Sequence, residues 1–152
     1  MMRRSTVVRV RPEDGTGLSV TLAVPGYRAF AFTATALRVP TATGELLIEA
    51  GHPSCVIPLD IGPFTVDAGA RTWLAALHGG ELRVADDEID IVAATIEFAD
   101  RIDVDRARAA QADAAHRLEH DRDDRAALLA LRRANVRLAV AARVHPSPGA
   151  RR

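Results

Sequence analysis

The sequence predicts a mainly β protein with a helical end: a β domain of the sandwich or barrel type over residues 18–100, then an antiparallel two-helix hairpin over residues 101–145. Up to about Glu97, apolar residues recur at alternate positions, which is the period of a half-buried strand. Turn-forming residues separate these short apolar runs. Beyond Glu97 the period changes to about 3.6 residues, the period of an amphipathic helix.

The two ends of the chain are expected to lie outside this core. Residues 1–17 carry Arg, Pro, Glu, Asp and Gly without periodicity, which predicts a flexible N-terminal extension. Residues 146–152 contain Pro146 and Pro148, which do not continue a helix, so a disordered tail is expected there.

The strand pattern begins at Leu18, Val20, Leu22 and Val24, which share one face of a strand that Pro25-Gly26 closes. It recurs often enough to predict eight or nine strands, at a spacing typical of sandwiches and barrels. The further runs are Phe30/Phe32, Leu37/Val39, Leu46 to Ile48, Val56/Ile57, Phe64/Val66, Trp73/Leu74, Leu82/Val84 and Ile89/Ile91. The predicted turns are Thr43-Gly44, Gly51-His52-Pro53, Gly62-Pro63, His78-Gly79-Gly80 and Asp86-Asp87.

Two apolar stripes predict the helices. Ala107, Ala110, Ala114 and Leu118 form the first, and Ala127, Leu131, Ala134, Leu138 and Ala141 form the second. The polar residues 120–124 between them suit a tight hairpin, with Asp103 and Asp124 as candidate N-caps. Because alanine buries little area, at roughly 25 cal/mol per Å² the hairpin is expected to be only marginally stable, and therefore able to move.

Charge and composition exclude several classes of protein. The first 100 residues carry eight Arg and 13 acidic residues, and the last 52 carry 12 Arg and seven acidic residues, without any Lys. The basic half is interleaved with acids that would repel phosphates, which argues against nucleic-acid binding. The single cysteine, Cys55, excludes an intramolecular disulfide. Neither a signal peptide nor a membrane span is expected.

The sequence carries no enzyme signature. His52 near Cys55 and Asp60 would suit a thiol nucleophile, but Cys55 opens the apolar run Cys55-Val56-Ile57, where a buried small hydrophobe is the better interpretation. His116 and His120 lie one helical turn apart among acids and are interpreted as a solvated face rather than a metal site. The patterns GxxxxGK[ST], GxGxxG and GxSxG are absent.

One charge pattern suits a phosphate ligand. Asp103 and Arg106 lie one turn apart at the start of the first helix, and Arg133 and Arg137 lie one turn apart on the second. Facing turns of this kind present guanidinium forks to a phosphate. Taken alone, the same spacing is also that of ordinary surface charges on a helix, and this is the simpler interpretation.

The run LRVPTATGELLIEAGHP, from Leu37 to Pro53, resembles the ε subunit of bacterial F-type ATP synthases, which typically reads VxxPxxxGELGILPGHAP here. Two more blocks follow in the family's order: His78 to Val84 resembles its GGxxxV hairpin, and Ile102 to Ala107 its IDxxRA sequence. Leu47, Ala50 and Pro53-Ser54 depart from the family pattern. The similarity extends over about Leu18 to Arg143.

The resemblance implies a ten-stranded β-sandwich followed by two helices, in a monomeric, non-catalytic rotor subunit. Such a subunit sits on the γ subunit and the membrane c-ring, at the cytoplasmic face of the bacterial inner membrane and peripheral to it. It couples ion flow to ATP synthesis. Its hairpin can extend toward the α/β catalytic hexamer and restrain ATP hydrolysis.

The resemblance also implies site residues. It transfers an ATP site between the folded helices, with ATP as a regulatory ligand rather than a required cofactor, and transfers the family's contact with γ or the ring to Glu45 and His52. The ATP-site residues would be Glu97, Asp103, Arg106, Ala107, Arg133 and Arg137. Two alternatives stay open: a free-standing β-domain adaptor whose helices dock an unrelated partner, and a small β-barrel enzyme using His52 and Cys55.

Overall fold

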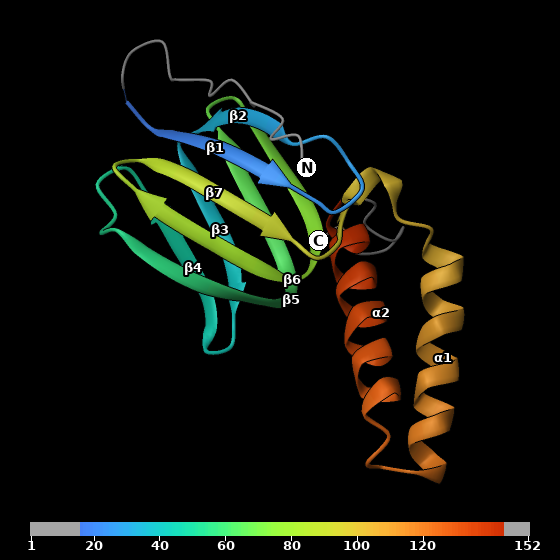
Figure 1. Ribbon diagram of the computed structural model, residues 1–152. Coiled ribbons are helices and arrows are strands. Elements are labelled where there is room, and N and C mark those ends of the chain that lie inside the picture. Colours follow the sequence, from blue (N-terminus) through green and yellow to red (C-terminus); the bar gives the residue numbers. More distant parts are fainter. Residues whose placement is uncertain (1–15, 145–152) are drawn as a thin grey trace.

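A β-sandwich and a pair of antiparallel helices beside it make up the molecule (Figure 1). The computed structural model describes residues 16–144, so most of the predicted N-terminal extension and the whole predicted tail lie outside the described residues. Within the described range the fold class that the sequence predicts, strands first and a helical hairpin second, is confirmed.

Eight strands form one continuous sheet in this range, in the order β2-β1-β7-β6-β5-β3-β4, with β8 pairing on β6. They are β1 (Leu18–Ala23), β2 (Phe30–Ala34), β3 (Ala36–Thr41), β4 (Gly44–Glu49), β5 (Cys55–Ala68), β6 (Arg71–Ala85), β7 (Glu88–Ala93) and β8 (Ile96–Phe98). A 3-10 turn, η1 (Ala99–Arg101), leads to α1 (Val104–His120) and α2 (Arg125–Val144).

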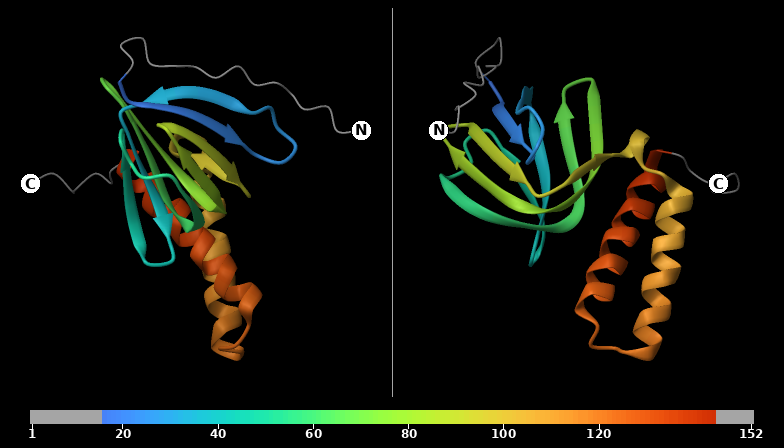
Figure 2. Two further views of the ribbon diagram at one scale, coloured as in Figure 1. Left: turned by 60° about the vertical axis from the view of Figure 1, so that its left-hand side comes forward. Right: turned by 45° about the vertical axis from the view of Figure 1, so that its right-hand side comes forward.

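The sheet closes into a sandwich because its two longest strands belong to both layers. β5 and β6 pair along their whole length, from Cys55↔Val84 to Ala68↔Arg71. One end of this ladder joins β7, β1 and β2, whereas the other joins β3, β4 and β8. Both strands curve as they pass between the layers (Figure 2). The two inner faces then pack on each other as in other sandwiches.

The merging of strands corrects several sequence predictions. The separate runs Val56/Ile57 and Phe64/Val66 are one strand, β5, and Trp73/Leu74 and Leu82/Val84 are one strand, β6. This is why eight strands are found where the resemblance implies ten. Gly62-Pro63 and His78-Gly79-Gly80 are not turns but lie inside these strands.

The two glycines in β6 do not form the hairpin turn that the sequence predicts. Gly79 and Gly80 both adopt positive φ, at 87° and 145°, and a Cβ at Gly80 would collide with the carbonyl oxygen of Val92 on β7. Glycine is therefore needed for close backbone approach at a bend within a strand. The true hairpin turn follows at Asp86-Asp87, as predicted, with both residues at positive φ.

One apolar core fills the space between the two layers. Its largest fully buried members include Leu18, Leu37, Ile48 and Phe64, which come from four different strands and confirm the alternation seen in the sequence. A second, smaller cluster lies outside this core, between the sandwich and α2. It is built on Ala76, Ala99, Val136 and Val140.

The two helices pack along alanines. Ala107 and Ala114 of α1 and Ala127, Ala134 and Ala141 of α2 are all buried, as the stripes predict, whereas the predicted Ala110, Leu118, Leu131 and Leu138 are half-buried. Asp103 caps α1 by accepting a 3.0 Å hydrogen bond from the backbone N–H of Arg106. Asp124 accepts one from Ala127 at the start of α2. Both predicted N-caps are confirmed.

The sequence did not predict that α2 would carry a second apolar face. Val136 and Val140 point away from α1 and onto the sandwich, so that α2 lies between the sandwich and α1 (Figure 1). The ion pairs between α2 and the sandwich involve Arg132 and Arg137, and the tip of the hairpin projects beyond the sandwich (Figure 2).

Candidate functional site

A cluster of charged side chains joins the bend of the long strands to α2. The Nε2 atom of His78, on β6, lies 3.0 Å from Oε1 of Glu97, on β8. The same oxygen accepts a 2.7 Å hydrogen bond from Nε of Arg137, on α2. One carboxylate oxygen therefore links two strands of the sandwich to the helix.

His78 reaches this position because it shares a face of β6 with Leu74 and Ala76. Their neighbours Ala75 and Leu77 point into the sandwich core, while Leu74 and Ala76 belong to the cluster under α2. The register partner of His78 on β5 is Ile61, which also packs in that cluster. Strand alternation thus directs the imidazole toward α2.

Burial governs the protonation of His78. Its side chain is only 3% exposed, and its Nδ1 atom is buried without a hydrogen-bond partner among the described residues. Desolvation lowers the pKa of His78 below its ordinary value, and the positive charges of Arg137 and Arg133 act in the same direction, whereas Glu97 opposes them. The neutral ring donates through Nε2–H to Glu97, which leaves Nδ1 as a bare acceptor.

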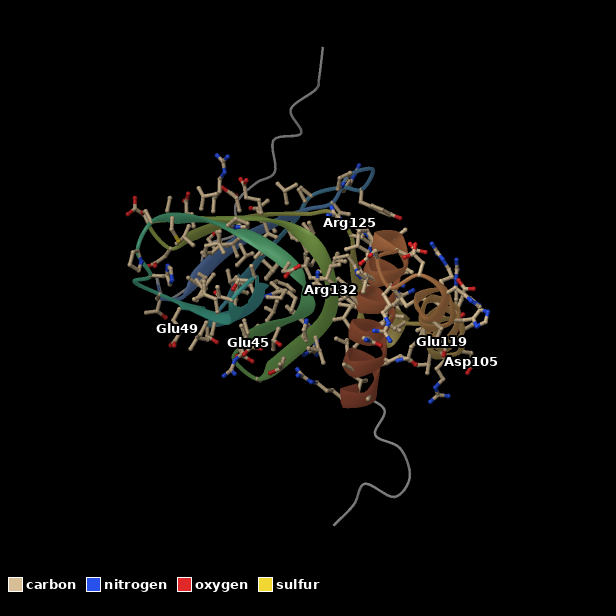
Figure 3. All side chains as sticks on the ribbon, turned by 90° about the horizontal axis from the view of Figure 1, so that it is seen from below. Glu45, Glu49, Asp105, Glu119, Arg125 and Arg132 are labelled. Atoms are coloured by element: carbon tan, nitrogen blue, oxygen red, sulfur yellow. The ribbon has the colours of Figure 1, made fainter. Side chains whose placement is uncertain are left out.

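A second link ties β5 to α2. Nη2 of Arg132 donates to Oδ1 of Asp60 at 2.9 Å, and the backbone N–H of Ile61 donates to the same oxygen at 2.8 Å. The Ile61 hydrogen bond is the largest cause of the lowered pKa of Asp60, and Arg132 lowers it further. Figure 3 shows Arg132 on the side of α2 that faces the sandwich.

The structure brings together only part of the predicted nucleotide site. Glu97 and Arg137 form a direct pair, as described above, and Asp103 and Arg106 are joined through the N-cap. Ala107 is 2% exposed and lies in the alanine-lined contact between α1 and α2, the alanine seam.

The two remaining arginines of that set are free to meet a ligand. Arg106 and Arg133 are exposed and make no side-chain ion pair or hydrogen bond within residues 16–144. Gln111 donates to Asn135 across the hairpin at 2.8 Å, which fixes the register of the two helices. At about 1.5 Å per residue, that register sets Arg106 roughly one turn along the axis from Arg137 and two turns from Arg133.

The predicted contact residues Glu45 and His52 lie on the sandwich, away from α1. Glu45 is exposed on β4 and forms an ion pair with Arg38 at 3.5 Å (Figure 3). His52 lies in the loop between β4 and β5, with Nδ1 2.9 Å from the carbonyl oxygen of Pro53.

The structure also places the other histidines that the sequence singles out. Nδ1 of His52 lies 3.9 Å from Sγ of Cys55, which is half-buried in β5 opposite Val84. His116 and His120 stack edge to face, with ring centroids 4.7 Å apart. The described residues contain no group of three or more side chains able to hold a metal ion.

Five of the six aromatic residues gather at one groove of about 310 Å³. Phe30, Trp73 and Phe98 are 54%, 38% and 37% exposed there, and Trp73 packs edge to face on Phe32. The signal available in the sequence was the gathering of nearly all aromatics into a few strands, but only the strand pairing shows that they converge. Apolar surface of this kind marks contact with a partner.

Comparison with known proteins decides the family. Residues 17–99 match the model of the ATP synthase delta/epsilon chain β-sandwich domain. The ATP synthase epsilon chain of Bacillus pumilus is 42% identical over 105 residues, covering 68% of this chain and 80% of the relative. That of Anaeromyxobacter sp. (strain K) is 35% identical over 130 residues, covering 83% and 98%.

This chain belongs to the ATP synthase epsilon-chain family. The resemblance to the ε subunit seen in the sequence is thereby confirmed, and the alternative of a free-standing β-domain adaptor is not supported. The fold is shared with a chain of the Euglena gracilis mitochondrial ATP synthase, which superposes with a TM-score of 0.70 at 22% identity, covering 93% of this chain and 89% of that one.

The family match bears unequally on the two parts of this epsilon chain. The domain model ends at residue 99, just before the helical hairpin, whereas the Anaeromyxobacter relative is covered over 98% of its length. The hairpin is thus part of the family relationship as well. Within the described residues, no helix is long and apolar enough to cross a membrane.

Proposed function

We propose that this epsilon chain is a non-catalytic rotor subunit of an F-type ATP synthase, peripheral to the membrane at its cytoplasmic face. Its sandwich sits on the γ subunit and the c-ring, and its hairpin restrains ATP hydrolysis by the α/β hexamer. The match of the sandwich domain and of full-length epsilon chains carries this proposal.

The aromatic groove gives the sandwich a surface for the γ subunit. Phe30, Trp73 and Phe98 expose apolar rings that a neighbouring subunit would bury. Substituting Trp73 by Ala should abolish co-purification of γ with a tagged chain. The control change Val92→Ala truncates an apolar side chain that is even more exposed than Trp73, at 54% against 38%, but lies outside the groove, and it should leave γ recovery unchanged. Recovery of γ with both variants would exclude this surface.

Control of hydrolysis by the hairpin requires that α2 can leave the sandwich. Two ion pairs, Asp60–Arg132 and Glu97–Arg137, and one apolar cluster hold it there. The cluster is built on Ala76, Ala99, Val136 and Val140, with Ile61, Leu74 and Ile102 packed against them. A ligand or partner with a modest preference for one position of the hairpin can therefore shift its population.

The double variant Arg132→Ala, Arg137→Ala tests this control. It removes both ion pairs and should favour the released hairpin, which lowers ATP hydrolysis in the reconstituted enzyme and leaves γ binding intact. Arg108→Ala with Arg122→Ala removes two exposed arginines without ion pairs in the described residues and serves as control. Equal hydrolysis with both double variants would contradict regulation by hairpin release.

The same hairpin offers a site for ATP. The exposed guanidinium groups of Arg106 and Arg133 flank the Glu97–Arg137 pair and suit a phosphate chain. A nucleotide there would hold the folded hairpin through its greater affinity for that state. Equilibrium dialysis of the purified chain should show ATP retention that Arg106→Ala and Arg133→Ala reduce and Arg122→Ala does not. A chain that retains no ATP at about millimolar concentration binds with a Kd weaker than about 1 mM, and this result would overturn the proposed site.

A further inference from the structure

The buried imidazole of His78 lies where the hairpin meets the sandwich. It belongs neither to the proposed ATP site nor to the aromatic groove. Its ring contacts the one carboxylate, Glu97, that also binds Arg137 of α2. The apolar contact around it is built on Ala76, Ala99, Val136 and Val140, with Ile61, Leu74 and Ile102 partly buried against them. A change of one charge at this point acts directly on the contact between α2 and the sandwich.

The groups facing His78 come from each element packed on it. Glu97 approaches from β8, and Arg137 and Arg133 approach from α2. On β5, Asp60 lies beside the register partner Ile61 and is already bonded to Arg132. With a neutral ring, the group formed by His78, Glu97, Arg137 and Arg133 carries one net positive charge. Protonation would raise this to two and would place the added charge on a ring that is only 3% exposed.

The hydrogen-bond geometry adds a second cost. Protonation places a new N–H on Nδ1, the atom that is buried without a partner among the described residues. A buried donor without an acceptor loses its hydration and gains nothing in return. Release of α2 removes both costs, because it exposes the ring to water and withdraws the two arginines.

We propose that His78 is a pH-sensitive lock on the helical hairpin: the neutral ring keeps α2 docked on the sandwich, and protonation of the ring releases it. The docking equilibrium is a property of this chain alone. Only its consequence for ATP hydrolysis rests on the proposed function.

The sign of the effect follows from the lowered pKa of docked His78. In the released state the ring is exposed and titrates near its ordinary value of about 6.5. The contribution of neutral His78 to docking is therefore complete above about pH 6.5 and is lost as the pH falls toward the lower docked value. Over that interval the ratio of released to docked hairpin rises by up to about tenfold per pH unit.

A thiol-protection experiment on the full chain measures this ratio even when the released state is rare. In a Cys55→Ser background, Val140→Cys places one thiol in the buried contact between α2 and the sandwich. Its labelling rate by a pyridyl disulfide, divided by that of an unfolded peptide at the same pH, gives the docking equilibrium. We expect protection to fall up to about tenfold per unit below about pH 6.5.

Two variants and one reporter make the result decisive. His78→Gln keeps a side-chain N–H for Glu97 without titrating, so its protection should stay flat from about pH 8 to about pH 5. His116→Gln changes an exposed histidine on α1 and should retain the wild-type response. Val39→Cys, in the sandwich core, should stay protected throughout.

Three results would overturn the lock. They are constant protection of the thiol at position 140 in the wild-type background, an unchanged pH response in His78→Gln, and parallel loss of protection at position 39, which would assign the effect to unfolding of the whole chain. Should His78→Gln fail to fold, His78→Asn, with the same neutral amide, takes its place. Loss of γ binding with an intact pH response would contradict the rotor function and leave the lock standing.

Discussion

Nε of Arg137, on α2, donates a 2.7 Å hydrogen bond to Oε1 of Glu97, on β8. The last strand of the sandwich is thereby joined to α2. Both side chains are 28% exposed, which leaves the pair only partly screened by water. The same oxygen is 3.0 Å from Nε2 of His78. One carboxylate oxygen of Glu97 therefore joins α2 to two strands of the sandwich.

Replacing Glu97 by Gln should weaken docking by about 1–2 kcal/mol, because a hydrogen bond to a charged group is lost and Arg137 keeps a neutral partner at best. The thiol at position 140 would then lose roughly 5–30-fold of its protection. Glu119→Gln, which removes the exposed partner of His116, should change protection by less than about twofold. Equal effects of the two substitutions would show that Glu97 does not hold α2.

Asp103 has a structural role that must be separated from any part in ATP binding. Its carboxylate accepts from the backbone N–H of Arg106 and caps α1. Asp103→Ala should destabilise the helix by about 1 kcal/mol, whereas Asp103→Asn should preserve the cap. Thermal unfolding followed by circular dichroism checks this difference. If Asp103→Asn retains less ATP but keeps its normal helix content, the negative charge of Asp103 contributes to ATP binding and not only to the helix cap.

Gly80 should tolerate no side chain. A Cβ there meets the backbone of Val92 and Ala93, and its φ of 145° is strained for other residues. Gly80→Ala is expected to destabilise the fold by about 2–4 kcal/mol, measured by urea unfolding. At Gly69, φ is also positive, at 68°, but nothing lies within 4 Å, so Gly69→Ala should cost only about 1 kcal/mol. Similar losses at the two sites would contradict the proposed close approach of β7.

Sequence periodicity predicted which residues lie in strands and helices, because burial of one face imposes a period on the chain. It did not separate bends from turns. Gly62-Pro63 and Gly79-Gly80 have the composition of loops, yet they lie inside β5 and β6, where long-range pairing with neighbouring strands overrides local preference.

The sites were predictable to different degrees. The family resemblance places Glu97 and Arg137 in one predicted nucleotide site but does not predict the ion pair that they form with each other. His78 was assigned to a hairpin turn, because nothing local shows that α2 covers that face of β6. Val136 and Val140 were missed for the same reason: a helix that packs on two partners has two stripes, and the stronger alanine stripe hides the weaker one.

The alanine seam between the helices sets how closely they pack. Ala134 is fully buried on the side facing α1, whereas Ala139 is exposed on the same helix. Ala134→Leu should overfill the seam and destabilise the hairpin by about 1–3 kcal/mol, while Ala139→Leu should be nearly neutral. Helix melting by circular dichroism distinguishes them, and a neutral Ala134→Leu would mean that the helices do not rest on these alanines.

Asp60 should make the stability of the folded chain depend on acid, at lower pH than that at which His78 acts on docking. Its pKa is lowered chiefly by the Ile61 N–H and then by Arg132, so its carboxylate stabilises the docked, folded chain above its ordinary pKa of 3.8. That contribution is lost as the pH falls through the lowered value. Asp60→Asn removes the charge but keeps an oxygen for Ile61.

Urea unfolding between about pH 6 and about pH 2.5 tests this dependence. The wild-type chain should be more stable than Asp60→Asn above the ordinary pKa, and the gap should close as the pH falls below the lowered one. Asp113→Asn, an exposed mid-helix change without an ion pair in the described residues, should follow the wild-type curve throughout. A gap that stays constant to the lowest pH would mean that the Asp60 charge makes no contribution, because a difference in packing alone does not titrate.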